Sequence, residues 1–296
     1  MAGNKGPMVV GYDGSPASEW AVDWAAVEAA RRGQDLVLLF AADMSGLYRP
    51  FVTQGVSSDF PQKMAHVIAQ AGVARARAAA PGVSVDSKIT SRDAAVALTE
   101  ASAQASLLVV GGRGRSRLSE ALLGTVQFAV TAHARCPVAV VPPGCHNAPD
   151  ADHPVIVGVD GSHGSDQALR EAAATATSWA VPLRVVGAWQ TPPVEHWSHF
   201  NVIDEEWREE MAIAVRLAAT DSVTAAAQAA REEHPNLEVR EVTVEGRPST
   251  VLANESDDAS LVVVGARGRG DLASLLLGSV GRNLIHTTGC PVEVTR

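Results

Sequence analysis

The chain has 296 residues, of which 46% are hydrophobic and 19% charged, a composition typical of globular proteins and a length that suits two domains. Its 24 Lys and Arg against 33 Asp and Glu leave a net charge of −9, which disfavours a dedicated nucleic-acid binder. No apolar run approaches the ~18–20 residues of a membrane span, and no secretory signal precedes the first apolar stretch at Met8. Three cysteines are too few for a disulfide framework, so we expect a cytoplasmic protein.

The first half of the chain alternates apolar runs with helical patterns. In chain order we predict strand Met8–Tyr12, helix Pro16–Arg32, strand Leu36–Ala41, helix Gln62–Ala80, strand Val83–Thr90, helix Ala94–Gln104, strand Leu107–Gly111, helix Thr125–Ala134 and strand Val138–Val141. Ser15 suits the N-cap of the first helix, and Gly33 suits its C-cap. The strands are almost continuously Val and Leu, which is typical of a parallel sheet covered by helices on both faces.

Three blocks of sequence recur in the second half in the same order. Val9–Ser15 recurs as Ile156–Ser162, 147 residues later, which matches Asp13 with Asp160. Leu108–Arg115 recurs as Val262–Arg269, and Cys136–Val138 recurs as Cys290–Val292, both 154 residues later. The growth of the offset predicts a short insertion between the second strand and the third helix of the second copy. Strands are therefore expected near 155–159, 183–188, 238–244, 261–265 and 292–294.

This duplication predicts an α/β fold of two tandem, doubly wound domains, each with a five-stranded parallel sheet. We expect the first domain at residues 1–143 and the second at 154–296, joined by a turn-rich linker at 144–153.

Glycines after the fourth strand of each half form the most informative motif. Gly111-x2-Gly114-x9-Gly124-Thr125 in the first half matches Gly265-x2-Gly268-x9-Gly278-Ser279 in the second. A glycine turn at the carboxyl end of a strand lets backbone N–H groups approach an anion, and a following helix N-terminus adds further donors. Two donor clusters separated by nine residues suit a polyphosphate.

Together with an Asp-Gly-Ser after the first strand and a Cys-Pro-Val before the last, this motif resembles the universal stress protein family, over essentially the whole chain and twice. The resemblance implies ATP binding, with or without Mg²⁺, at one site per domain. Asp13 and Asp160 would contact the ribose or adenine, and Ala41 and Ala188 the adenine. The residues around the ribose and phosphates would be Gly111, Gly114, Gly124, Thr125 and Val126 in the first domain and Gly265, Gly268, Gly278, Ser279 and Val280 in the second. The full predicted sites add the strand glycines Gly11 and Gly158 and the loop cations Arg113, Arg115, Arg267 and Arg269.

One departure and several alternatives accompany these sites. After its third strand the second copy has Glu245–Pro248, close to the family's Gly-x-Pro, whereas the first copy has Ser91–Ala94, so we expect the second site to match the family better. The glycine turns could be ordinary strand-to-helix connections, the two aspartates could cap the following turn, and the arginines could be solvated loop charges. Cys136 and Cys290 are interpreted as buried small residues.

The sequence also lacks several catalytic motifs. It contains no phosphate-loop lysine motif, no nucleophile-elbow motif and no set of kinase catalytic motifs. The leading hypothesis is therefore an ATP-binding stress-response regulator with little or no turnover and without a metal site. The alternatives are a slow ATPase and a nucleotide-free dimerisation scaffold. The two halves are expected to pack through their last strands, as a homodimer or pseudo-dimer, without nucleic-acid or membrane partners.

Overall fold

The computed structural model describes residues 6–41, 60–112, 125–145, 149–191, 205–269 and 277–296. The chain forms two compact units. Unit 1 contains Met1–His146, Thr288–Val294 and Arg296, and unit 2 contains Asn147–Thr287 and Thr295. Within the described ranges, no helix is both long enough and apolar enough to cross a membrane.

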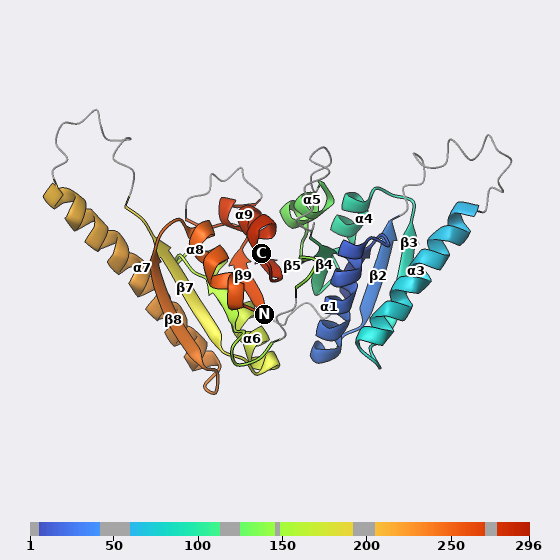
Figure 1. Ribbon diagram of the computed structural model, residues 1–296, viewed down its shortest axis with the longest axis horizontal. Helices are drawn as coiled ribbons and strands as arrows, with labels where there is room; N and C mark the ends of the chain where they lie inside the picture. Colours follow the sequence, from blue (N-terminus) through green and yellow to red (C-terminus); the bar gives the residue numbers. More distant parts are fainter. Residues whose placement is uncertain (1–5, 42–59, 113–124, 146–148, 192–204, 270–276) are drawn as a thin grey trace, which may run out of the picture. The chain divides into compact units, whose positions relative to one another are not determined.

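Unit 1 has a parallel sheet with helices on both faces (Figure 1). Its elements are β1 (Met8–Tyr12), α1 (Pro16–Arg32), β2 (Leu36–Ala41), α3 (Phe60–Ala79), β3 (Val85–Thr90), α4 (Ala94–Ala101), β4 (Leu107–Gly111), α5 (Thr125–His133) and β5 (Val138–Val141). The strands pair in the order β3-β2-β1-β4-β5, all parallel. The final strand of the chain, β10 (Val292–Thr295), pairs antiparallel with β5, with Glu293 opposite Ala139.

Unit 2 repeats the same order of elements. They are β6 (Val155–Gly158), α6 (His163–Trp179), β7 (Leu183–Trp189), α7 (Glu205–Glu233), β8 (Val239–Glu245), α8 (Pro248–Glu255), the 3₁₀ turn η3 (Ser256–Asp258), β9 (Leu261–Gly265) and α9 (Ser279–Thr287). The strands pair in parallel in the order β9-β6-β7-β8. The predicted fold class, two tandem doubly wound α/β repeats with five strands contributed by each, is confirmed.

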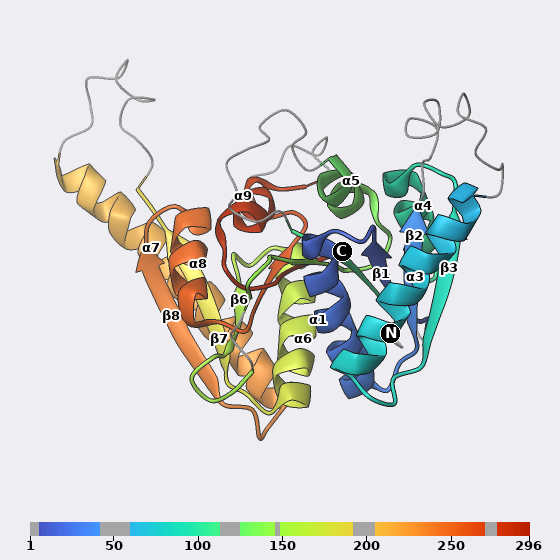
Figure 2. The ribbon, with the colours of Figure 1, turned by 45° about the vertical axis from the view of Figure 1, so that its right-hand side comes forward.

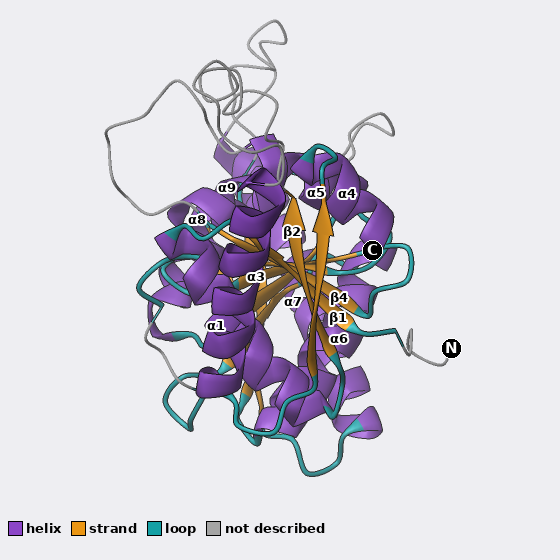
Figure 3. Ribbon diagram, turned by 90° about the vertical axis from the view of Figure 1, so that its right-hand side faces the viewer, coloured by secondary structure: helices purple, strands orange, loops and turns teal. Residues whose placement is uncertain are grey.

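Alternate residues of β1 face different helices. Met8 and Val10 are fully buried in the core formed with α1 and α3, while Gly11 faces the opposite way, so that a Cβ on it would lie 3.2 Å from Leu98 of α4. Helices α1 and α3 therefore cover one face of the sheet and α4 the other. Figure 2 shows α1 and α3 side by side over the strands of unit 1, and Figure 3 shows strands enclosed between helices.

The helix that follows the first strand of each repeat has clear end signals. In α1, the Ser15 side chain accepts the N–H of Ser18, and the helix ends at Gly33 in the left-handed conformation (φ 61°). In α6, Ser162 is the matching N-cap, but the C-cap is Ala180, also left-handed (φ 57°). A left-handed alanine is less favourable than a left-handed glycine by about 1–2 kcal/mol, and this end of α6 is closed by the N–H groups of Ala180 and Val181, which donate to the carbonyls of Thr177 and Ala176.

Some predicted boundaries in the first repeat were wrong. The helix predicted to reach Gln104 ends at Ala101, because Ala103 and Gln104 donate to residues three positions back, which forms a tighter turn. The third strand begins at Val85 rather than Val83. In the second repeat, α7 has 29 residues against 20 in α3, so the inserted residues lengthen a helix before β8.

Candidate functional site

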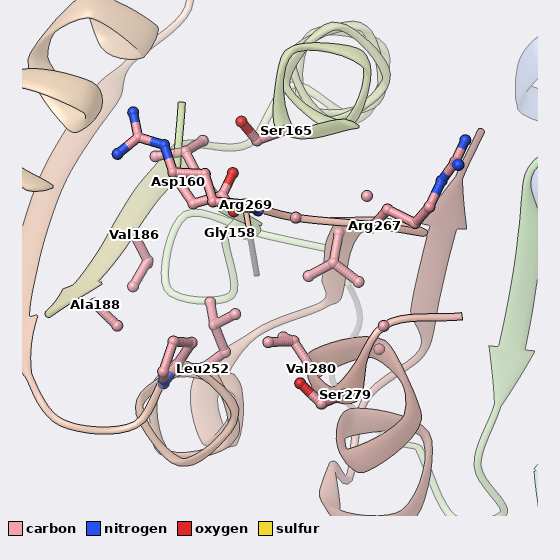
Figure 4. A pocket seen from close by; sticks show the side chains of 17 residues that line it. Gly158, Asp160, Ser165, Val186, Ala188, Leu252, Arg267, Arg269, Ser279 and Val280 are labelled. Atoms are coloured by element: carbon pink, nitrogen blue, oxygen red, sulfur yellow. Dashed lines mark hydrogen bonds between the residues drawn. The ribbon is translucent and has the colours of Figure 1, made fainter. Parts of the chain in front are cut away.

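A pocket of about 380 Å³ lies at the carboxyl ends of β6, β7 and β9 in unit 2 (Figure 4). This edge of a doubly wound sheet is where ligands of such folds bind. All ten residues that the sequence singled out in the second half line this one pocket. They are Gly158, Asp160, Ala188, Gly265, Arg267, Gly268, Arg269, Gly278, Ser279 and Val280.

The glycine loop after β9 packs tightly on the segment that joins β6 to α6. A Cβ on Gly268 would lie 2.5 Å from Oδ2 of Asp160, and one on Gly265 would lie 2.7 Å from the carbonyl carbon of Gly164 in the first turn of α6. Real Cβ atoms do not come this close to other heavy atoms. Gly265 is therefore required by packing against backbone atoms, whereas a side chain on Gly268 would have to displace the Asp160 carboxylate.

Asp160 holds the loop through its carboxylate. Its Oδ1 accepts the N–H of Ser162 (3.0 Å), and its Oδ2 accepts the N–H of Arg269 (2.9 Å). Burial by itself would raise the pKa of this carboxyl, but hydrogen bonds from Ser162, Arg269 and Ser165 outweigh burial and lower the pKa below its ordinary value. The turn-capping alternative considered for this aspartate is thus present in the structure, and it extends to the glycine loop 109 residues away.

Donor groups border one side of the pocket. Helix α9 begins at Ser279, and the first N–H groups of a helix have no acceptor within it. The N–H of Gly278 donates instead to the carbonyl of Ala266 (2.8 Å), which joins the two ends of the loop. Arg267 and Arg269 extend from the loop in opposite directions (Figure 4), and neither pairs with a carboxylate among the residues that the structure describes.

Apolar groups line the other side of the pocket. Val186 and Ala188 of β7 face Leu252 of α8, with Pro248 at the start of that helix (Figure 4). Gly158 makes room here, because a Cβ on it would lie 2.8 Å from a methyl group of Leu252. The pocket therefore combines an apolar side with a side that carries N–H donors, and two arginines extend from its glycine loop in opposite directions.

Seven further lining residues were not identified from the sequence. They are Val159, Ser165, Val186, Pro248, Leu252, Val264 and Gly281. Most are apolar residues of strands or helices, and their pattern is that of ordinary core positions. Pro248 has a signal in the sequence, because Glu245–Pro248 is close to the Gly-x-Pro of the family.

The matching residues of the first repeat are described only in part. Gly11 lies in β1, Asp13 directly follows the end of that strand at Tyr12, Ala41 ends β2 and Gly111 ends β4, as predicted. The carboxylate of Asp13 accepts the N–H of Ser15 (2.9 Å), as Asp160 does from Ser162. Val126 lies in the first turn of α5, which begins at Thr125. Arg113, Gly114, Arg115 and Gly124 lie outside the described residues, as does Arg117.

The cysteines are free, and Cys136 and Cys290 are buried, as interpreted from the sequence. Burial, the largest effect, raises the pKa of the Cys136 thiol to about 12. A thiol with this pKa is almost entirely protonated at neutral pH, which suits a packing role. The part of the chain that the structure describes contains no group of three or more His, Cys, Asp or Glu side chains arranged to hold a metal ion.

Comparison with known proteins agrees with this architecture. The profile of the Universal stress protein family matches residues 6–142 and again 153–296. The universal stress proteins Rv2005c and Rv2623 of Mycobacterium tuberculosis are each 33% identical over 294 residues, covering 98% of this chain and 96% of theirs. The crystal structure of a universal stress protein from Archaeoglobus fulgidus has the same fold, with a TM-score of 0.68 at 19% identity, covering 100% of this chain and 99% of that one. The chain belongs to the universal stress protein family and carries two of its domains in tandem.

Proposed function

We propose that this chain binds ATP, with or without Mg²⁺, in the pocket of unit 2 and at the matching place in the first repeat, as a stress-response regulator with little or no catalytic turnover. The observation that carries the proposal is a single pocket that has an apolar side, a side with N–H donors and a glycine loop that carries two arginines. In this proposal the adenine ring lies against Leu252 and the end of β7, and the phosphates lie at the glycine loop and the N-terminus of α9, residues that line the pocket.

The size and chemistry of the pocket suit this ligand. A volume of about 380 Å³ lies within the range of small-molecule sites, which is roughly 300–1,000 Å³. Micromolar affinity requires about −8 kcal/mol. Several charge-assisted hydrogen bonds at about 1.5–3 kcal/mol each provide this after the entropy of ordering the ligand is subtracted.

Low turnover is part of the proposal because the pocket offers little for activating water. Asp160 is the one carboxylate among the described lining residues, and its two oxygens already accept backbone N–H groups. The lowered pKa of Asp160 makes its carboxylate a weak general base, since an effective base has a pKa near the working pH. Membership of the chain in the universal stress protein family supports the proposed role in stress response. The association of chains into homodimers stays a prediction.

The experiment starts with protein purified without added nucleotide. We expect heating to release adenine nucleotide, identified by mass spectrometry, and calorimetric titration of the emptied protein to show ATP binding in the micromolar range. Steady phosphate release well above about one turnover per minute, against ~10 per second for typical enzymes, would favour the ATPase alternative. Protein that releases no nucleotide and binds none would favour the scaffold.

A further inference from the structure

One residue that faces the glycine loop differs between the repeats. In the second repeat, Gly164 occupies the first turn of α6, and a Cβ on it would lie less than 3.0 Å from the carbonyl oxygen of Arg267. The carbonyl oxygen of Arg267 is a backbone atom, so the glycine loop itself would have to shift to admit a Cβ on Gly164. At the matching place in α1, the first repeat has Ala17.

The structure establishes that these two positions match. A Cβ on Gly265, at the end of β9, would meet the carbonyl group of Gly164, and a Cβ on Gly111, at the end of β4, would meet the carbonyl group of Ala17. The same helix turn therefore lies against the same strand end in both repeats. A side chain is present at this position in one repeat and absent in the other.

The second repeat holds its glycine loop at three consecutive residues. Gly164 leaves space for the carbonyl of Arg267, Asp160 leaves no space for a side chain on Gly268, and the Asp160 carboxylate accepts the N–H of Arg269 at 2.9 Å. Residues 267–269 are thus set against the β6–α6 connection before a ligand arrives. Such preorganisation strengthens binding because less ordering remains to be done.

We propose that Gly164 is a positioning residue for the nucleotide site, and that the two repeats consequently bind ATP unequally, with the tight site in the second repeat. This inference rests on the proposed function. Since Ala17 carries a real Cβ, the space that Gly164 leaves in the second repeat is occupied by a side chain in the first. A duplicated motif then yields one tight site and one weaker site per chain.

The test is calorimetric titration of the full chain with ATP. We expect one molecule of ATP to bind tightly to each chain. We expect Gly164→Ala to raise the Kd of this tight site at least about tenfold, because a displaced loop weakens several hydrogen bonds together. Gly289→Ala is the matched control, since Gly289 has no atom within 4 Å of its Cβ position and lacks a left-handed backbone. Its Kd should equal that of the wild type.

The converse variant keeps the inference testable if Gly164→Ala fails to fold. Ala17→Gly should lower the Kd for ATP at the weaker site about threefold or more and leave the Kd at the tight site unchanged. Two equal equivalents in the wild type, or a Gly164→Ala protein that is folded by circular dichroism and binds normally, would overturn the inference while leaving ATP binding intact. Absence of any ATP binding would reject the proposed function and the inference with it.

Discussion

The two repeats build the start of their first helix in the same way. Ser15 accepts the N–H of Ser18, and Ser162 accepts the N–H of Ser165, each at 3.3 Å. Each repeat also has an aspartate two residues before that serine, whose carboxylate accepts the serine N–H. These contacts form within a few residues of sequence. Duplication has preserved this local frame because each copy needs it to join strand to helix.

The repeats differ at residues outside this shared turn. Ala17 replaces Gly164, and Asp93 is the N-cap of α4 where Arg247 is the N-cap of α8. Neither difference disturbs the sheet. In unit 2, Gly164 packs against Arg267, and Arg247 directly precedes Pro248; Arg267 and Pro248 both line the pocket. Matching motifs thus establish a common fold more securely than they establish equal binding, and the predictions below test that distinction.

The largest expected effect comes from placing a carboxylate in the glycine loop. Gly268→Glu should raise the Kd for ATP in the second repeat more than about 100-fold, because the new Cβ has no space beside Asp160 and the added charge repels phosphate. Gly268 is exposed, so unit 2 should remain folded. Calorimetric titration measures the binding, and circular dichroism checks the fold.

Gly289→Glu is the control for that variant, because it adds the same charge at an exposed glycine with open space around it. It should bind ATP as the wild type does. Tight binding retained by Gly268→Glu would show that the pocket of unit 2 is not the tight site, and would remove the basis for distinguishing the repeats.

A smaller effect is expected from the aspartates at the ends of the first strands. Asp160→Asn places an amide NH₂ opposite one of two backbone N–H donors, so it should raise the Kd about five- to tenfold and lower the free energy of unfolding by about 1 kcal/mol. Asp13→Asn should leave the tight equivalent unchanged. An equal rise in the Kd of the tight site in both variants would contradict unequal ATP binding by the two repeats.

The Asp160 effect should depend on pH in a defined direction. The pKa of Asp160 is lowered in the folded protein, so its carboxylate stabilises the fold above the unfolded-state pKa of about 4. That contribution is lost as the pH falls through the lower, folded-state pKa. Urea unfolding should therefore separate wild type from Asp160→Asn at pH 7, and the difference should shrink at pH 3. A difference that grows in acid would contradict this assignment.

Much of the fold was predictable because its signals are local. Gly33 and the apolar run Leu36–Ala41 marked the end of one helix and the extent of the next strand correctly. The end of α4 was missed because residues 102–104 continue as a tighter turn, which periodicity does not distinguish from a helix. The insertion itself was predicted from the offset between the repeats, but the sequence did not show that it lengthens α7, because it could have formed a loop equally well.

The candidate site was predictable where it depends on glycines and charges, and not where it depends on shape. Gly268 and Arg269 were identified from a motif, and they line the pocket. Leu252 and Val186 were missed because a hydrophobic residue on a pocket wall has the same periodicity as one in the core. The role of Gly164 appears only when the distance from α6 to the loop is known.

The smallest expected effect is a change of charge at the N-caps of α8 and α4. Arg247 provides no side-chain cap for α8, whereas the Asp93 carboxylate accepts the N–H of Val96 at 3.1 Å in α4. Arg247→Asp should stabilise unit 2 by about 0.5–1 kcal/mol, because a capping carboxylate satisfies a free helix N–H. It should at the same time raise the Kd for ATP about two- to threefold at low salt, because it replaces a positive charge beside Pro248 in the pocket wall with a negative one.

These opposite signs separate the two physical causes. A charge effect at an exposed residue is screened by salt, so the difference in Kd should disappear near 1 M salt while the gain in stability persists. Asp93→Arg should do the reverse in the first repeat, lowering the stability of unit 1 and tightening its weaker ATP equivalent. If Arg247→Asp changed stability alone, at every salt concentration, the charge at this N-cap would not reach the nucleotide, and the difference between the repeats would rest on the packing of the glycine loop.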